Sequence, residues 1–252
     1  MTATLVRRSE PGRAAPRRTW WFEPVPRARV AWLRIVLGTF VWLDVLVTTP
    51  WVAGHAGVPA GLYQPLFVAR VLGLPRPTPV LVWAVQVVVL CSAAVVVAGR
   101  RPRSAGVALF GSYLAWMLIA MSYGKVDHDR FAFLVALAVL PTVGPARRSD
   151  RQEDEAAGWA VRCIQVAVVL TYLLAAAAKL RFGGIEWLDG STLMRAVLRR
   201  GTFLTDPLVD NPWTLHAAQY ALVAFELASP LMLVPGRLGR WFVGAAFAFH
   251  LV

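Results

Sequence analysis

The feature that most constrains the fold is an uncharged apolar run that ends in a lysine. No charged residue occurs between Cys163 and Ala178, and Lys179 follows directly. At about 1.5 Å per residue, a helix over this run covers most of a hydrocarbon layer roughly 30 Å thick. The run therefore predicts a membrane-spanning helix that carries a lysine at one end.

Similar apolar runs recur along the chain, and 58% of its 252 residues are hydrophobic. Charges gather in short blocks between the runs, which is typical of a helical integral membrane protein. We expect an all-α polytopic transmembrane bundle of about six to seven spans over residues 30–252, with short interfacial helices on its outer face. Residues 1–29 are expected to form a basic cytoplasmic tail. The expected spans are residues 30–48, 80–98, 104–123, 131–143, 158–180, 214–234 and a run from 241. That last run stops at Val252, as it would in a truncated piece of a longer protein.

The net charge of +12 does not point to a nucleic-acid partner, because the arginines lie beside the spans rather than on one soluble face. Their uneven distribution predicts a multi-pass protein of the cell membrane with a cytoplasmic amino terminus. Lys179 and His128 then lie together on the outer face. Cys91 and Cys163 fall within apolar runs without zinc-ligand spacing, so neither a metal nor a disulfide is expected.

Lys179 has two possible roles. A lysine at a helix end commonly extends its amine to the lipid headgroups as an anchor. However, 24 of the 26 basic residues are arginine, and a desolvated lysine can act as a base where arginine cannot. Tyr172, Ala175 and Ala176 share a helix face with Lys179 by their spacing, which predicts small or hydroxyl-bearing neighbours for the amine.

Other polar groups fall in or beside the spans. His128 lies between Asp127 and Asp129 in an outer loop, where it is either solvated or oriented by one of these carboxylates. We expect Asp44 to meet a polar partner from another helix, and we interpret Asp44 and Glu226 as structural links. Arg34 is expected to extend to the cytoplasmic headgroups.

Several motifs occur in a characteristic order. Tyr172, Ala175 and Lys179-Leu180 are followed by Trp-Leu-Asp-Gly at residues 187–190. The first span carries R-I-V-L-G-x-x-x-W-x-D, and E-L-x-S-P-L-x-L-x-P-x-R-x-x-R leads to a final F-H pair. With the histidine-bearing loop, this set resembles the vitamin K-dependent gamma-carboxylase family. It resembles more closely the bacterial relatives of that family, the HTTM (horizontally transferred transmembrane) domain proteins.

The resemblance implies a chemistry and a site. Lys179 would act as base on reduced vitamin K or a menaquinol-type quinone, which oxygen converts to an epoxide. The strong base so formed would remove a proton from a glutamate, carbon dioxide would trap the carbanion, and His128 would serve this carboxylation half. Tyr172, Ala175, Trp187 and Asp127 are the positions expected to line the quinone site.

A second function class stays open. The animal enzymes carry a large lumenal region after their membrane helices, whereas this sequence ends at Val252. The alternative is a non-catalytic or partner-dependent membrane scaffold subunit that binds a quinone or lipid beside a separate soluble or membrane protein. A transporter is less favoured, because the sequence shows no internal repeat.

Overall fold

The computed structural model describes residues 19–124, 126, 128–203, 205 and 209–250, without the side chains of His128, Arg200 and Pro212. The described chain is mostly helical. Four of its helices are long and apolar enough to cross a membrane: α1 with its continuation (Arg27–Thr48), α3 (Pro79–Val97), α4 (Pro102–Ala120) and α6 with its continuation (Glu155–Gly183).

Three shorter helices occupy the remaining expected spans. They are α5 (Phe131–Val139), α9 (Pro212–Leu227) and α10 (Arg237–Phe249). The predicted count of six to seven spans is therefore not confirmed, since four of the described helices reach spanning length. Pro141 at the end of α5 and Pro230 after α9 help explain the short lengths, because proline does not continue a regular helix.

Short elements join these helices. The α1 helix proper is Arg27–Leu43 and α6 proper is Glu155–Ala178; each continues into a π-helical turn, η2 (Asp44–Thr48) and η7 (Lys179–Gly183). The other connecting helices are η1 (Trp20–Phe22), η3 (Pro50–Gly57), η4 (Ala60–Leu62), α2 (Phe67–Val71), η5 (His128–Arg130), η6 (Leu140–Thr142), η8 (Ile185–Asp189), α7 (Ser191–Arg200) and η9 (Ser229–Leu233).

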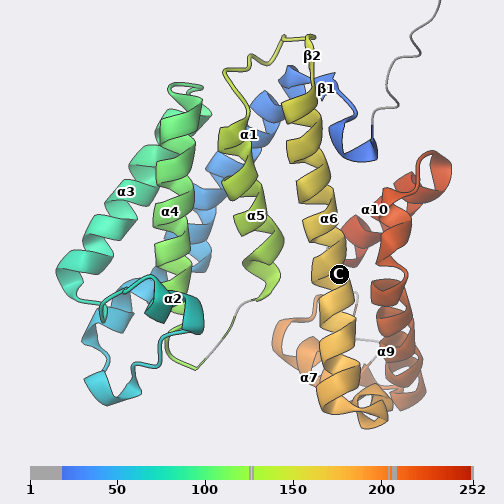
Figure 1. Cartoon of the computed structure of the whole chain (residues 1–252). Helices are drawn as coiled ribbons and strands as arrows, with labels where there is room; N and C mark the ends of the chain where they lie inside the picture. Colours follow the sequence, from blue (N-terminus) through green and yellow to red (C-terminus); the bar gives the residue numbers. More distant parts are fainter. Residues whose placement is uncertain (1–18, 125, 127, 204, 206–208, 251–252) are drawn as a thin grey trace, which may run out of the picture.

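The helices form a bundle with an added pair. Helices α1, α3, α4 and α5 pack together, α6 runs beside α5, and α9 and α10 lie on the other side of α6 (Figure 1). Helix α4 is central, and it contributes the fully buried Tyr113, Trp116 and Met117 to the main core. Helix α6 is peripheral, since only 17% of its most apolar window is buried against 50% for α4. Most of the surface of α6 is therefore left uncovered by the described part of the chain.

Glycines allow two close backbone approaches. A Cβ at Gly106 would lie 2.8 Å from Cγ of Pro141, which lets α4 pack against the end of α5. A Cβ at Gly158 would lie 2.0 Å from the carbonyl oxygen of Glu23, so only glycine lets the start of α6 meet this strand-like segment. Small residues at helix contacts are the usual means of close packing in membranes.

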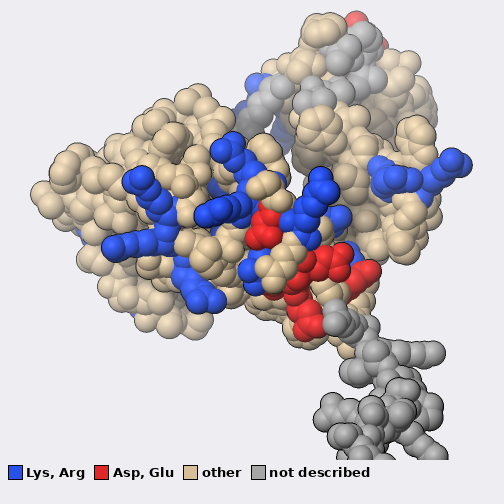
Figure 2. Space-filling view, turned by 90° about the horizontal axis from the view of Figure 1, so that it is seen from above, with Lys and Arg blue, Asp and Glu red and all other residues tan. Residues whose placement is uncertain are grey.

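One end of the molecule is rich in arginine. Seen from above, Lys and Arg side chains gather over this end, with acidic side chains beside them (Figure 2). Its exposed arginines include Arg100, Arg101, Arg103, Arg147, Arg148 and Arg151. We call it the arginine-rich end, and the opposite end, which carries Lys179, the lysine end.

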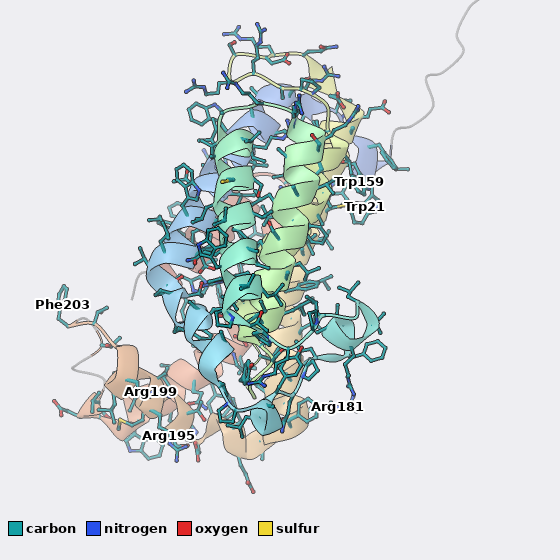
Figure 3. All side chains as sticks on the ribbon, turned by 90° about the vertical axis from the view of Figure 1, so that its left-hand side faces the viewer. Trp21, Trp159, Arg181, Arg195, Arg199 and Phe203 are labelled. Atoms are coloured by element: carbon teal, nitrogen blue, oxygen red, sulfur yellow. The ribbon has the colours of Figure 1, made fainter. Side chains whose placement is uncertain are left out.

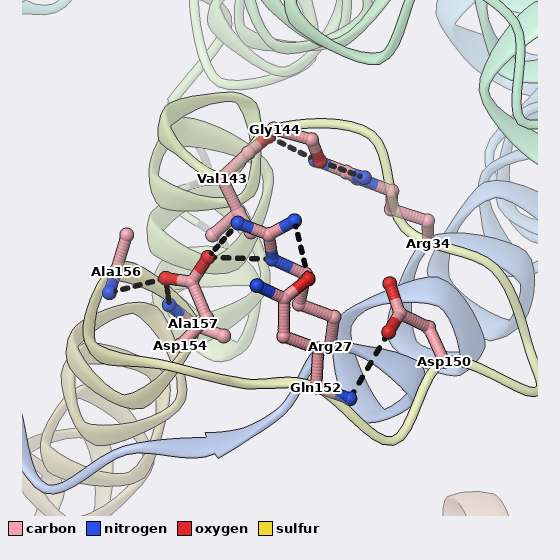
Figure 4. Close-up of polar contacts among 9 residues, drawn as sticks. All are labelled: Arg27, Arg34, Val143, Gly144, Asp150, Gln152, Asp154, Ala156 and Ala157. Carbon is pink, nitrogen blue, oxygen red and sulfur yellow. Dashed lines mark hydrogen bonds and ion pairs between the residues drawn. The ribbon is translucent and has the colours of Figure 1, made fainter.

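A two-residue strand pair ties the arginine-rich end together. Strand β1 (Val25–Pro26) pairs antiparallel with β2 (Glu153–Asp154). Arg27, the first residue of α1, bonds the carboxylate of Asp154 at 2.6 Å, and that carboxylate accepts the Ala156 and Ala157 N–H groups (Figure 4). Asp154 therefore caps α6 and joins it to α1. Helix α1 begins three residues before the expected boundary at residue 30, and residues 1–18 lie outside the described part.

Arg34 does not extend to the headgroups, so the sequence prediction for it is wrong. Its side chain is only 4% exposed. The guanidinium donates hydrogen bonds to the carbonyl oxygens of Val143 and Gly144 at 2.6 and 3.0 Å (Figure 4). It also donates one to the carbonyl oxygen of Leu140 at 2.9 Å. These carbonyl groups lie at and after the end of α5, where no backbone N–H group of a following helical turn is available to bond them. The several N–H donors of the Arg34 guanidinium bond them instead.

Candidate active site

Lys179 lies where α6 changes from an α-helix to a π-helix. The run of alanines ends at Ala178, and Lys179 begins the π-helical turn η7. Single π-helical turns are rare and often mark functional sites. The Lys179 side chain is 23% exposed, so its amine is largely removed from the surface.

The amine of Lys179 forms an ion pair with Glu226. The carboxylate comes from α9, its side chain is 9% exposed, and its Oε1 atom is the partner of Nζ. The other carboxylate oxygen, Oε2, is buried and makes no hydrogen bond within the described residues. From the sequence we expected Glu226 to be a structural link, without Lys179 as its partner. Opposite charges in two apolar spans were a signal that these residues pair, but the sequence does not show which spans are neighbours.

The ring of Trp187 also packs against the Lys179 amine. Its ring centroid lies 5.0 Å from Nζ of Lys179, which is a cation–π distance. Two glycines make this fold-back possible. Gly184 has φ +61° and ψ −161°, a conformation that other residues avoid, and a Cβ at Gly183 would lie 2.8 Å from the Trp187 side chain.

An apolar cavity of about 850 Å³ opens beside Lys179. Its lining is aliphatic and aromatic apart from Lys179 and Thr171, and it is drawn from helices α2, α4, α5 and α6. Ala175, one of the small residues expected near the amine, is part of this lining together with Ala178, whereas Ala176, which was also expected there, is not. The other lining residues are Leu66, Val68, Leu114, Leu118, Met121, Val126, Phe131, Leu134, Leu174 and Phe182.

The histidine-bearing loop borders the same cavity. Val126 and Phe131, on either side of His128 in the sequence, both line it. The backbone of His128 begins the short helix η5. Its side chain, together with Asp127 and Lys125, lies outside what the structure describes.

A buried polar network holds the end of that loop. Asp44 at the end of α1 is fully buried, and its carboxylate accepts hydrogen bonds from Tyr113 and Arg130 at 2.6 Å each and another from Thr48. Trp116 donates to the hydroxyl of Thr49 at 3.0 Å nearby. The prediction that Asp44 meets a polar partner from another helix is confirmed. Because Arg130 directly precedes α5, this pair fixes the start of α5 at the cavity edge.

Tyr172 faces away from the cavity, so the single face predicted for α6 is divided in two. Ala175 lines the cavity, whereas the hydroxyl of Tyr172 bonds Nε2 of His250 at 2.7 Å. The Tyr172 ring also packs edge-on against Phe225 of α9, with centroids 6.0 Å apart. Residues at i and i+3 are 60° apart around a helix, and this offset is enough to separate their neighbours. A partner for His250 could not be predicted from the sequence.

An amphipathic helix completes the lysine end. Helix α7 begins after Gly190, and the Asp189 carboxylate accepts the Ser191 N–H at 2.8 Å. That backbone hydrogen bond is the main cause that lowers the pKa of Asp189. Arg195 and Arg199 project from α7 at the end opposite Trp21 and Trp159 (Figure 3).

Comparison with known proteins identifies a family. No curated protein matches the chain, and no solved structure matches it. The model of one family, described as the HTTM domain, matches residues 22–252. This range contains the Lys179–Glu226 pair, the apolar cavity and the histidine-bearing loop. The chain therefore belongs to the HTTM domain family.

Proposed function

We propose that this chain is a membrane enzyme that uses Lys179 as a general base on a reduced naphthoquinone of the vitamin K or menaquinol type. One observation carries the proposal: a partly buried lysine amine opens on a large apolar cavity whose lining includes the membrane-length helices α4 and α6. Such a cavity takes a lipid-soluble ligand, and the amine supplies a reactive group at its edge.

The residues present fit such a ligand. Pockets for small organic molecules commonly measure about 300–1,000 Å³ and pair an apolar lining with a few polar groups. The cavity of about 850 Å³ falls in this range, and Lys179 and Thr171 are its polar members. Exposed Phe182 and Leu174 lie at its edge on α6. A ligand dissolved in the bilayer would meet the cavity at this lipid-facing side.

The roles of the side chains follow from their positions. A reduced naphthoquinone would supply an acidic hydroxyl group. Its oxidation by oxygen would lead to an epoxide. Nζ of Lys179 would take up the hydroxyl proton, Glu226 would exchange protons with this amine, and Trp187 would exclude water from it.

The coupled reaction is proposed on the resemblance to the gamma-carboxylases. In it, a glutamate of a protein or peptide would lose a γ-proton and be carboxylated by carbon dioxide, with His128 serving this half. A separate soluble or membrane protein would present or contain that glutamate. The positive-inside rule would place the arginine-rich end in the cytoplasm and the candidate site at the outer face of the cell membrane.

One observation favours the second candidate, a scaffold subunit that binds a quinone or lipid without catalysis. Lys179 is paired with Glu226, and an ion pair between two membrane helices is also a common structural link. In that case the positive charge of Lys179 would matter, but its ability to release a proton would not. Arginine keeps the charge and does not deprotonate, so it separates the two functions.

The deciding experiment measures oxygen-dependent epoxidation of reduced naphthoquinones by the purified chain in nanodiscs. Lys179→Ala and Lys179→Arg should both lose activity by about 10²-fold or more, as is usual when a general base is removed. Lys125→Arg changes the only other lysine and should keep the wild-type rate. Helix content by circular dichroism should be the same in all four proteins.

Two results would contradict the proposal. Wild-type activity in Lys179→Arg would show that the amine is not a base. A wild-type chain that is inactive on every quinol tested, yet retains a quinone through purification, would favour the scaffold subunit.

A further inference from the structure

Polar side chains continue beyond Lys179 from the buried Glu226 of α9 to Tyr172 of α6 and the exposed His250 at the end of α10. Glu226 pairs with Lys179, and Tyr172 bonds His250 at 2.7 Å. Tyr172 lies two helical turns from Lys179 on α6, about 10 Å along the axis. Ionisable groups are rare within membrane spans, and proton relays are one of the functions that retain them.

The two pairs are close to one another. The Tyr172 ring packs against Phe225, the residue directly before Glu226. The Glu226 carboxylate also acts electrostatically on the Tyr172 phenol. Its buried Oε2 atom makes no hydrogen bond in the described part of the chain. This oxygen is therefore free to hold a proton taken from Lys179.

A second cavity lies farther along α6 and α10. It measures about 790 Å³ and lies toward the arginine-rich end, and its mixed lining includes the polar residues Arg162, Gln165 and Arg240. Gln165 is two turns before Tyr172 on α6, and Val243, also in its lining, is two turns before His250 on α10. On both helices the cavity thus comes within about 10 Å of the Tyr172–His250 pair.

We propose that Glu226, Tyr172 and His250 form a proton route from Lys179 to the cavity at the arginine-rich end. The proposal rests on the base role proposed for Lys179. A base in an apolar cavity must release each proton that it gains before it can act again. Among the described residues that line the Lys179 cavity, Thr171 is the only polar side chain besides Lys179 itself. The route supplies one on the opposite face of α6.

The step moves one proton and no electrons. The Lys179 ammonium gives a proton to Glu226, and the amine then takes the proton of the ligand hydroxyl, whose oxygen keeps the bonding pair. Glu226 passes its proton to the Tyr172 oxygen, directly or through a bridging water, while Tyr172 gives its own proton to Nε2 of His250. The ion pair is restored, and the imidazolium of His250 carries the charge. Tyr172 on α6 bonds His250, and Glu226 on α9 acts electrostatically on Tyr172.

The first test does not depend on enzyme activity. Nitrogen-15 labelled histidine in the full chain gives NMR signals from four imidazoles, and His250→Gln identifies the signal of His250 by its loss. Tyr172→Phe and Glu226→Gln should each change the pH profile of that signal. His216→Gln, in a histidine that stacks on Tyr220 instead, should leave it unchanged. A profile unaffected by Glu226→Gln would disprove the route, whether or not the protein is an active enzyme.

The second test uses quinol turnover. Tyr172→Phe should slow it by about 10²-fold, as expected when a proton-transfer group is removed. Tyr220→Phe is the matched control and should keep the wild-type rate. Added imidazole should restore part of the rate lost in His250→Ala. If the wild type is active and Tyr172→Phe keeps its full turnover, the proton route is wrong but the base role of Lys179 is unaffected. Lys179→Arg tests that base role separately.

Discussion

At the scale of single residues, Asp44 determines how α1, α4 and α5 meet at the lysine end. Its carboxylate is fully buried and bonds Tyr113 of α4 and Arg130 at the start of α5. A buried charge without its partners is costly, so these contacts hold three helices in one arrangement.

Removing the charge of Asp44 should therefore destabilise the fold. Asp44→Asn leaves Arg130 without its counter-ion, and breaking a buried ion pair costs roughly 3–5 kcal/mol. Tyr113→Phe removes one hydrogen bond and keeps the ion pair, so it should cost about 1–3 kcal/mol. Thermal unfolding in detergent should show a clearly lower midpoint for Asp44→Asn than for Tyr113→Phe. Equal midpoints would indicate that the ion pair contributes little.

At the scale of elements, Asp154 both caps α6 and binds α1. Partial burial acts to raise the pKa of Asp154, but hydrogen bonds from Arg27 and from the Ala157 and Ala156 N–H groups outweigh it, and the pKa is lowered. A carboxyl whose pKa is lower in the folded state stabilises the fold at pH values above its unfolded pKa. This contribution is lost as the pH falls below about 4.

Two substitutions separate the cap from the ion pair. Asp154→Asn keeps a good helix cap and loses the charge contact with Arg27, so it should cost little and should weaken the loss of stability in acid. Asp154→Ala removes the cap as well and should cost about 1 kcal/mol more. Thermal unfolding at neutral pH and near pH 3 measures both effects. If Asp154→Asn lost as much stability near pH 3 as the wild type does, the Asp154 carboxyl would not be the cause of that loss.

At the scale of the whole molecule, the arginine-rich end and the lysine end should lie on opposite sides of the membrane. Ser149 and Ser191 are exposed residues of these two ends. In a variant without Cys91 and Cys163, Ser191→Cys should react with an impermeant thiol reagent added to intact cells. Ser149→Cys should react only after lysis. The reverse pattern would place the candidate site in the cytoplasm.

The sequence predicted the helices better than their contacts. The uncharged run before Lys179, the helix after Gly190 and the polar partner of Asp44 all follow from local pattern and the cost of burying charge. The pairing of Lys179 with Glu226 does not, because 46 residues separate them and hydropathy carries no information on which spans are neighbours. Arg34 was assigned to the headgroups because the sequence does not show the free carbonyls after α5.

The two π-helical turns make the register of the helices as important as their apolar character. Each begins at an intramembrane charge, Asp44 in η2 and Lys179 in η7. A π-helical turn contains more residues than an α-helical one, so deleting a residue there would restore regular geometry. The deletion would also rotate all that follows by about 100° and move Trp187 away from the amine. Such a shortened protein would keep the same hydropathy profile and a more regular helix, yet its reactive groups would no longer meet.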